Sequence, residues 1–297
     1  MNNIGIVGLG FVGNAVFEGM KHAFSIVGYD KIKGMKETRK QPYMEDIYAE
    51  QTQSDGLEAV VKNTDGPIFI CVPTPMRSDG SCDVTIVENV VRSLNDIVSN
   101  VGSKKKVIVI KSTVIPGTTE KLDQECENIH VCFNPEFLTE RSAVEDFKNQ
   151  DRIIIGGPRQ GTNVLKQVYA TAYPDVSVTK TSSTIAELVK YTTNCFLATK
   201  VAVANEIEQI SRALGVDYDK VVEYATKDKR LGLSHWAVPG PDGKKGFGGK
   251  CFCKDLNGLM VLAENLGLKA DVLQGAWASN LKVRPERDWE AIDGVVS

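Results

Sequence analysis

The stretch NIGIVGLGFVG, residues 3–13, is the part of this 297-residue chain that most clearly indicates its fold. An apolar strand runs to Gly8, and a helical run follows to about Lys21. Between them the spacing G-x-G-x-x-G places Gly8 at a tight turn, Gly10 where a pyrophosphate approaches, and Gly13 where the helix packs on the sheet. The N–H groups at the start of that helix face the phosphates. A strand, this motif and a helix in succession predict a dinucleotide-binding fold.

A second strand, residues 25–29, ends in Asp30, 20 residues after Gly10. A carboxylate at this place hydrogen-bonds the ribose hydroxyls and repels a 2′-phosphate, so NAD is favoured over NADP. Lys31 and Lys33 weaken that preference. A glycine-rich turn without a ligand is the alternative interpretation.

Strands and helices continue to alternate through the first 181 residues. Such alternation predicts a doubly wound, mostly parallel α/β sheet covered on both faces, which we assign to an NAD-binding domain, residues 1–181. The apolar runs predict strands at 67–72, 106–110, 129–133, 152–155 and 176–178, and helices at 56–63, 83–100 and 117–125.

Polar residues follow several of these strands. Ligands bind at the carboxyl ends of the strands in doubly wound folds, although the same residue types are common in turns and caps. The residues in question are Thr74, Thr113, Glu136 and Glu140.

A single long helix is predicted from Ser182 to about Leu214, without proline or glycine. Its apolar residues occupy more than one stripe, so it needs partners on several sides. We therefore expect a helical domain, residues 182–297, whose central helix is shared between two domains or two subunits. Lys190 and Asn194 lie four residues apart on one face of this helix, either on a solvated edge or pointing at the cofactor.

The segment GFGGKCFCKD, residues 246–255, combines three glycines with a cysteine at the start of an apolar helix. Unpaired N–H groups at a helix N-terminus, together with Lys250 and Lys254, lower the pKa of a thiol such as Cys251. Asp255 comes one turn later on the same face. The segment predicts an activated thiol; a glycine turn with a buried cysteine is the alternative.

The composition argues against several classes of protein. A net charge of −3 and a pI near 5.8 give no reason to expect nucleic acid or an acidic membrane as a partner, and no apolar run approaches membrane-spanning length. Seven scattered cysteines favour reduced thiols in the cytoplasm, with no signal peptide. The three distant histidines predict no metal site.

Six motifs in order resemble the UDP-glucose/GDP-mannose dehydrogenase family. They are GLGFVG at 8–13, VPTP at 72–75, KSTV at 111–114, NPEFLTE at 134–140, AELVKYTTNCFLATKVA at 186–202 and GFGGKCFCKD at 246–255. The resemblance implies a Rossmann domain joined through the long helix to a helical dimerisation domain, and hence a homodimer.

The resemblance also implies two successive NAD-linked oxidations at C6 of a nucleotide sugar, most simply UDP-glucose. Cys251 would capture the aldehyde as a thiohemiacetal, and the resulting thioester would be hydrolysed. Lys190 and Asn194 would hold the oxyanion, and Glu136 would be the base for hydrolysis. Asp255 and Thr113 would position water and relay protons.

Further contacts follow from the same resemblance. The cofactor contacts it implies are Gly8, Gly10, Phe11, Val12, Gly13, Asp30, Lys31, Pro73, Thr74, Thr113, Glu140 and Lys254. The substrate contacts are Glu136, Phe137, Leu138, Lys190, Asn194, Arg230, Phe247, Gly248 and Cys251.

The chain departs from the family pattern at three places. Cys253 stands where the family has proline, and we expect it to be a bystander. Residues 241–245, PDGKK, are an additional polar stretch. Only 46 residues follow Cys251, too few for the nucleotide-binding domain in which the family continues, so a short form is expected.

Two alternatives remain beside this interpretation. A two-electron β-hydroxyacid-type dehydrogenase shares the architecture and a Lys-xxx-Asn pair but has no catalytic thiol. A short NAD-binding subunit without its own activity is the other alternative.

Overall fold

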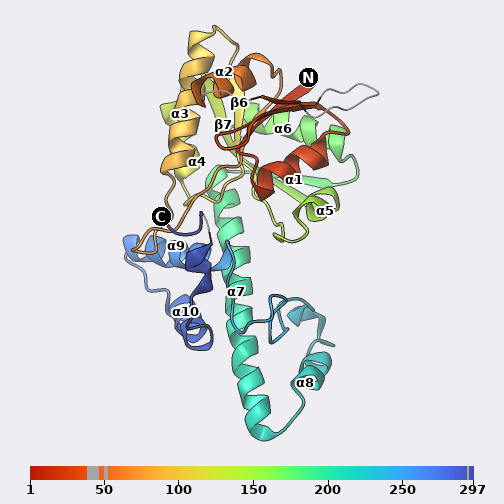
Figure 1. Ribbon diagram of the computed structural model, residues 1–297, viewed down its shortest axis with the longest axis vertical. Helices are drawn as coiled ribbons and strands as arrows, with labels where there is room; N and C mark the ends of the chain where they lie inside the picture. Colours follow the sequence, from red (N-terminus) through yellow and green to blue (C-terminus); the bar gives the residue numbers. More distant parts are fainter. Residues whose placement is uncertain (39–46, 50–52, 293) are drawn as a thin grey trace. The chain divides into compact units, whose positions relative to one another are not determined.

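The computed structural model describes residues 1–38, 47–49, 53–292 and 294–297. These residues form two compact units (Figure 1). The first unit comprises residues 1–74 and 84–190, and the second comprises residues 75–83 and 191–297. Helix α7 (Ser183–Leu214) begins in the first unit and continues in the second.

The first unit is built on one sheet, whose described strands run in the order β4-β3-β2-β1-β5-β6-β7-β8-β9. Strands β2, β1, β5, β6 and β7 are parallel neighbours. Beyond β2, strand β3 pairs antiparallel with β2, and β4 pairs antiparallel with β3. The strands are β1 (Asn3–Val7), β2 (Ser25–Asp30), β3 (Gly34–Thr38), β4 (Ile47–Ala49), β5 (Ile68–Ile70), β6 (Lys106–Ile110), β7 (Ile129–Phe133), β8 (Arg152–Gly156) and β9 (Ser177–Thr181).

Strand β8 meets β7 antiparallel through one pair, Phe133 and Gly156, and is itself parallel to β9. The prediction of a mostly parallel, doubly wound sheet is confirmed. Strands β3 and β4 were not expected, because GMKET carries no apolar run and β4 has only three residues.

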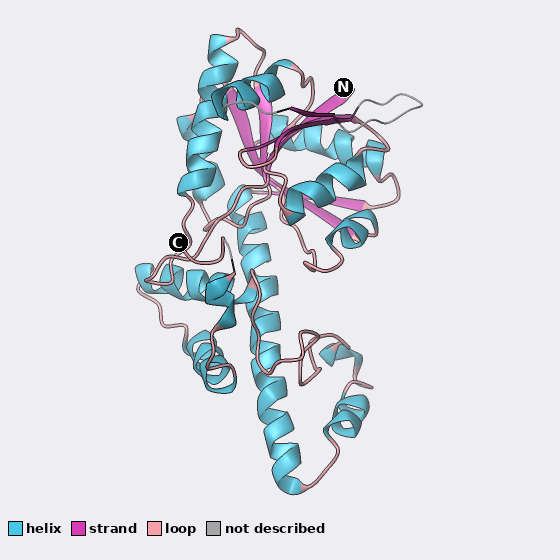
Figure 2. Cartoon of the chain, in the orientation of Figure 1, coloured by secondary structure: helices cyan, strands magenta, loops and turns pink. Residues whose placement is uncertain are grey.

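Helices cover both faces of this sheet (Figures 1 and 2). Alternate strand residues point to opposite faces, so Ile6 belongs to one buried cluster and Val7 to the other. On the Val7 face lie α2 (Gln53–Lys62), α3 (Thr85–Asn100) and α4 (Thr118–Glu125). On the Ile6 face lie α1 (Phe11–Met20), α5 (Ala143–Lys148) and α6 (Arg159–Ala172).

The described residues of the second unit form helices and loops around the later turns of α7. The long helix is confirmed. Its companions are α8 (Tyr218–Ala225), α9 (Phe252–Asn265), α10 (Asp271–Val283) and two short 3₁₀ turns, Lys229–Leu231 and Asp288–Ala291. Met76, in the segment 75–83, pairs with both Cys82 and Val296 through single bridges. None of the described helices combines the length and the apolar character that a membrane crossing requires.

Candidate active site

The three glycines of the first turn have three different surroundings. Gly8 has φ of +90°, and a Cβ there would lie 2.6 Å from the carbonyl oxygen of Cys71. A Cβ on Gly13 would lie only 1.9 Å from the carbonyl oxygen of Gly8, whereas one on Gly10 would meet no atom within 4 Å. The backbone at Gly10 is therefore open to a pyrophosphate, and these residues fit a dinucleotide.

Asp30, at the end of β2, is held by the turn it faces. Its Oδ2 accepts the Leu9 N–H at 2.6 Å, and its Oδ1 accepts those of Ile32 and Lys33 at 2.9 and 3.1 Å. Burial alone would raise the pKa of Asp30, but these N–H donors outweigh it and hold the pKa below its ordinary value. Lys33 Nζ donates to the Leu9 carbonyl at 2.7 Å, so a second contact joins the end of β2 to the glycine turn.

Thr74, Thr113 and Glu136 follow three neighbouring strand ends, those of β5, β6 and β7. All three are buried, whereas Glu140, four residues beyond Glu136, is exposed. The other expected cofactor contacts lie near the surface: Phe11 and Val12 are half-buried, and Lys31 and Pro73 are exposed.

Lys190 and Glu136 form a buried ion pair within the first unit. Lys190 Nζ lies 2.7 Å from Glu136 Oε1 and 2.6 Å from the Glu136 carbonyl oxygen, and the two side chains are 3% and 5% exposed. Glu136 Oε2 accepts the Leu138 N–H at 2.7 Å. Mutual pairing allows both charges to be buried, so α7 is tied to the loop after β7 at this point.

Glu187, one turn before Lys190, ties α7 to the loop after β6. Its two oxygens accept the N–H groups of Gly117 and Thr119 at 2.6 and 2.9 Å, at the N-terminus of α4. Burial raises the pKa of Glu187. The first turns of α7 therefore hold the two loops that carry Thr113 and Glu136.

Lys111 is a buried residue that the sequence reasoning did not single out. Its Nζ donates to the side-chain and main-chain oxygens of Asn134 at 2.8 and 3.2 Å, and the Tyr169 hydroxyl donates to the same side-chain oxygen. Burial lowers the pKa of Lys111 to about 8, although the nearby Cys71 and Glu136 act in the opposite direction. A lysine directly after the apolar run of β6 was the available signal.

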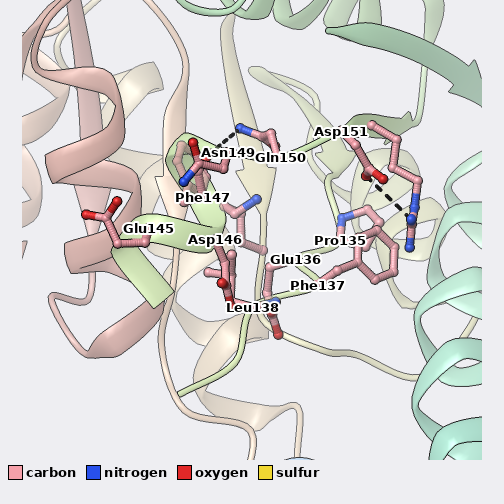
Figure 3. Close-up of a pocket in the computed structure, with 12 residues that line it drawn as sticks. Pro135, Glu136, Phe137, Leu138, Glu145, Asp146, Phe147, Asn149, Gln150 and Asp151 are labelled. Carbon is pink, nitrogen blue, oxygen red and sulfur yellow. Dashed lines mark hydrogen bonds and ion pairs between the residues drawn. The ribbon is translucent and has the colours of Figure 1, made fainter. Parts of the chain in front are cut away.

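Lys111 also lines a cavity of about 360 Å³ beside the loop after β7 (Figure 3). Figure 3 shows Pro135 to Leu138 from this loop, with Glu145 to Phe147 of α5 and the segment before β8. The Arg152 guanidinium lies 4.6 Å from the centre of the Phe137 ring. The cavity thus places charged and aromatic groups next to Glu136.

In the second unit, Cys251 stands at the N-terminus of α9, and the Asp255 N–H donates to its carbonyl oxygen at 2.9 Å. Cys251 is half-buried, whereas the other six cysteines are buried thiols. Burial raises the pKa of Cys253, which donates toward the Phe247 carbonyl at 3.7 Å. Of the seven thiols, that of Cys251 has the most access to solvent.

Asn194, Asp255 and Lys254 form a second buried group in this unit. Asn194 Nδ2 donates to Asp255 Oδ2 at 2.6 Å, and Lys254 Nζ pairs with Asp255 Oδ1. Burial works against the charge on Lys254, but Asp255, Cys82 and Cys251 together raise its pKa above the ordinary value. The Asp255 carboxylate is thus shared between an amide and an ammonium group.

The remaining expected substrate contacts have other surroundings. The exposed Arg230 pairs with Asp228, whose Oδ2 lies 3.0 Å from Arg230 Nε. The Phe247 side chain is buried between Phe252 and Trp277, with ring centres 6.3 Å away in each case. Phe247 therefore contributes its side chain to the core of the unit.

A Rossmann-type sheet with a glycine turn open to phosphate defines a class of dinucleotide-binding proteins. Residues 2–173 match the NAD binding domain of the UDP-glucose/GDP-mannose dehydrogenase family, and residues 184–282 match its central domain. The chain belongs to the UDP-glucose/GDP-mannose dehydrogenase family. NAD as the cofactor, expected from the first glycine turn and Asp30, is confirmed.

Relatives of the chain include enzymes with different sugar nucleotides. It is 33% identical to UDP-glucose 6-dehydrogenase of Rickettsia typhi, over 95% of this chain and 67% of that one. It is 31% identical to GDP-mannose 6-dehydrogenase of Pseudomonas savastanoi pv. phaseolicola, over 93% and 67%. The structure of a UDP-glucose dehydrogenase from Pyrobaculum islandicum is similar with a TM-score of 0.80 and 30% identity, over 95% and 68%.

Proposed function

We propose that the chain oxidises UDP-glucose to UDP-glucuronate at C6, with Cys251 as the nucleophile. NAD accepts a hydride in each of the two oxidations. The Cys251 thiolate adds to the C6 aldehyde to give a thiohemiacetal, whose oxidation leaves a thioester; water then releases the acid and regenerates the thiol. The observation that carries this proposal is that Cys251 is half-buried at the N-terminus of α9, whereas the other six cysteines are buried.

The other roles follow from the buried polar groups. Lys190 and Asn194 would stabilise the oxyanion, and Glu136 would activate water for thioester hydrolysis. Asp255 and Thr113 would position water and protons. Each of these five side chains is buried, so their positions are restricted before substrate arrives.

The carbohydrate and nucleotide contacts belong to the same proposal. The substrate contacts would be Phe137, Leu138, Gly248 and Arg230. The NAD contacts would be the residues expected at the first glycine turn, together with Thr74, Glu140 and Lys254. GDP-mannose is the second candidate substrate, since relatives named for it are nearly as similar as those named for UDP-glucose. The seven thiols favour a cytoplasmic location.

The stoichiometry of NADH tests the proposal. Purified protein is incubated with NAD and either UDP-glucose or GDP-mannose, and NADH is measured per acid formed. Two NADH per acid with one of the substrates, abolished in Cys251→Ser, is the expected result. Glu136→Gln should accumulate a thioester adduct visible by mass spectrometry. Full four-electron activity in Cys251→Ser would rule out the thiol mechanism.

We further propose a homodimer formed through α7. Phe196, Val203 and Ile210 are spaced by seven residues along the helix, and their exposed fractions are 70%, 45% and 53%. Such a stripe on a long helix suits a second copy of the same helix. Val203→Asp should give monomers by light scattering, and a stable dimer of this variant would contradict the proposal.

A further inference from the structure

The additional polar stretch at residues 241–245 is bound to the segment that follows α10 and to α7. Asp242 Oδ2 lies 2.8 Å from Arg284 Nη2, and Lys244 Nζ lies 2.7 Å from Asp288 Oδ2. Lys245 Nζ pairs with Glu208 of α7 at 2.7 Å. Three successive charged contacts thus fix the stretch that leads into the Cys251 segment.

Arg284 is the centre of this network. Its Nε donates to Asp288 Oδ1 at 2.6 Å and its Nη2 to Asp288 Oδ2 at 2.8 Å, while Asp242 approaches the same Nη2. The Arg284 side chain is only 3% exposed, and Nη1 has no hydrogen-bond partner among the described residues. Two carboxylates hold the planar guanidinium, so it has little freedom to move.

The guanidinium lies directly against Gly248, three residues before Cys251. A Cβ on Gly248 would lie 2.5 Å from Nη2 and 2.6 Å from Cζ of Arg284. One turn earlier on α10, Asn280 binds both main-chain groups of Phe247, accepting its N–H at 2.7 Å and donating to its carbonyl at 2.9 Å. Asn280 of α10 and Arg284, directly after this helix, therefore hold two consecutive residues of the loop.

We propose that Arg284, held by Asp242 and Asp288, is a positioning residue that fixes the Cys251 loop through Gly248. This inference rests on the proposed role of Cys251 as the nucleophile. Because a displacement of about 1 Å can lower a rate about a hundredfold, a rigid support for the loop would matter to the reaction even though Arg284 touches no reacting atom.

Alkylation of Cys251 by iodoacetamide measures the state of the loop without any substrate. The thiolate sulfur forms a bond to carbon and iodide leaves, and intact mass counts the alkylated cysteines. The other six cysteines are buried, so the first alkylation reports Cys251. The variant is Arg284→Met, and the matched control is Lys282→Met, which removes an exposed charge from the last turn of α10, two residues before Arg284.

In Arg284→Met we expect a single alkylation that is several-fold faster than in the wild type, because the loop has lost its support. We expect kcat to fall about a hundredfold while the KM for NAD changes by less than about twofold. Lys282→Met should match the wild type in all three measurements. Unchanged alkylation, or faster alkylation with unchanged kcat, would overturn the proposal.

Alkylation at several cysteines would show that Arg284→Met has unfolded. In that case the variant Asp242→Asn tests the proposal. That variant leaves Arg284 paired with Asp288, and it should still speed the single alkylation; an unchanged rate would overturn the proposal. A wild type without sugar-nucleotide turnover would defeat the proposed function alone. In that case the alkylation rates still decide whether Arg284 fixes the loop.

Discussion

The two glycine-rich segments, residues 8–13 and 246–251, each contain three glycines but are supported in different ways. In the first, main chain packs against main chain. A Cβ on Gly13 would lie 1.9 Å from the carbonyl oxygen of Gly8, and one on Gly8 would lie 2.6 Å from that of Cys71. The first segment is therefore shaped by the sheet and by its own turn.

In the second segment, the glycines pack against side chains, one from α10 and one from the residue directly after this helix. A Cβ on Gly246 would lie 2.3 Å from Asn280 Oδ1, and one on Gly248 would lie 2.5 Å from the Arg284 guanidinium. Support of this kind depends on two particular residues and on the carboxylates that hold one of them. A single substitution outside the second segment, at one of these supporting residues, should therefore make its main chain more mobile.

Each segment also has one glycine that faces open space. A Cβ on Gly10 or on Gly249 would meet no atom within 4 Å. Gly249 has φ of +71°, so its backbone conformation already favours glycine, whereas Gly10 has an ordinary φ of −68°. Packing and φ therefore explain every one of these glycines except Gly10, and access for a ligand is the explanation left for it.

Gly13→Ala should have the largest effect on stability. The new methyl group meets a main-chain oxygen that cannot rotate away, so α1 or the turn must shift. We expect the free energy of unfolding to fall by about 3 kcal/mol or more, measured by urea denaturation. A variant of near wild-type stability would show that the main chain of the first segment can shift to accept a methyl group, as is expected of a loop that packs against side chains.

Gly248→Ala should have a smaller effect, because the methyl group meets a side chain. We expect a loss of about 1–2 kcal/mol, since Arg284 is held in place by two carboxylates. The double variant Gly248→Ala with Arg284→Met should lose less than the sum of the two single variants, because the clash and its partner disappear together. Strict additivity would mean that the guanidinium does not restrain Gly248.

Much of the fold was predictable because many of its strands and helices coincide with local apolar patterns in the sequence. Strands β6 and β7 occur at the predicted residues, since four of the five residues in each are apolar and buried in the middle of the sheet. Helix α6 was missed because Gly161 and two threonines weaken its local pattern. Its position depends on tertiary packing, as a Cβ on Gly161 would lie 2.4 Å from Cys132 Sγ.

The residues of the candidate site could be proposed from the sequence, whereas the pairs that these residues form could not. Lys190 pairs with Glu136, and Asn194 pairs with Asp255, across 54 and 61 residues of chain. No local pattern specifies such partners. The role of Arg284 was not predicted for the same reason. A single arginine after an amphipathic helix resembles a surface residue until its carboxylate partners are known.

Gly10→Ala should have the smallest effect on stability and a clear effect on ligand binding. Alanine is a poorer N-cap than glycine but restricts the unfolded chain, so the two contributions offset to within about 1 kcal/mol. NAD affinity should fall at least about tenfold, or 1.4 kcal/mol, because the methyl group occupies the space that a pyrophosphate needs. Gly275→Ala within α10 is the matched control, since its Cβ also meets no atom within 4 Å, and it should keep the wild-type affinity in the same titration. Equal NAD affinity in both variants would mean that the open face of Gly10 is not where the phosphates bind.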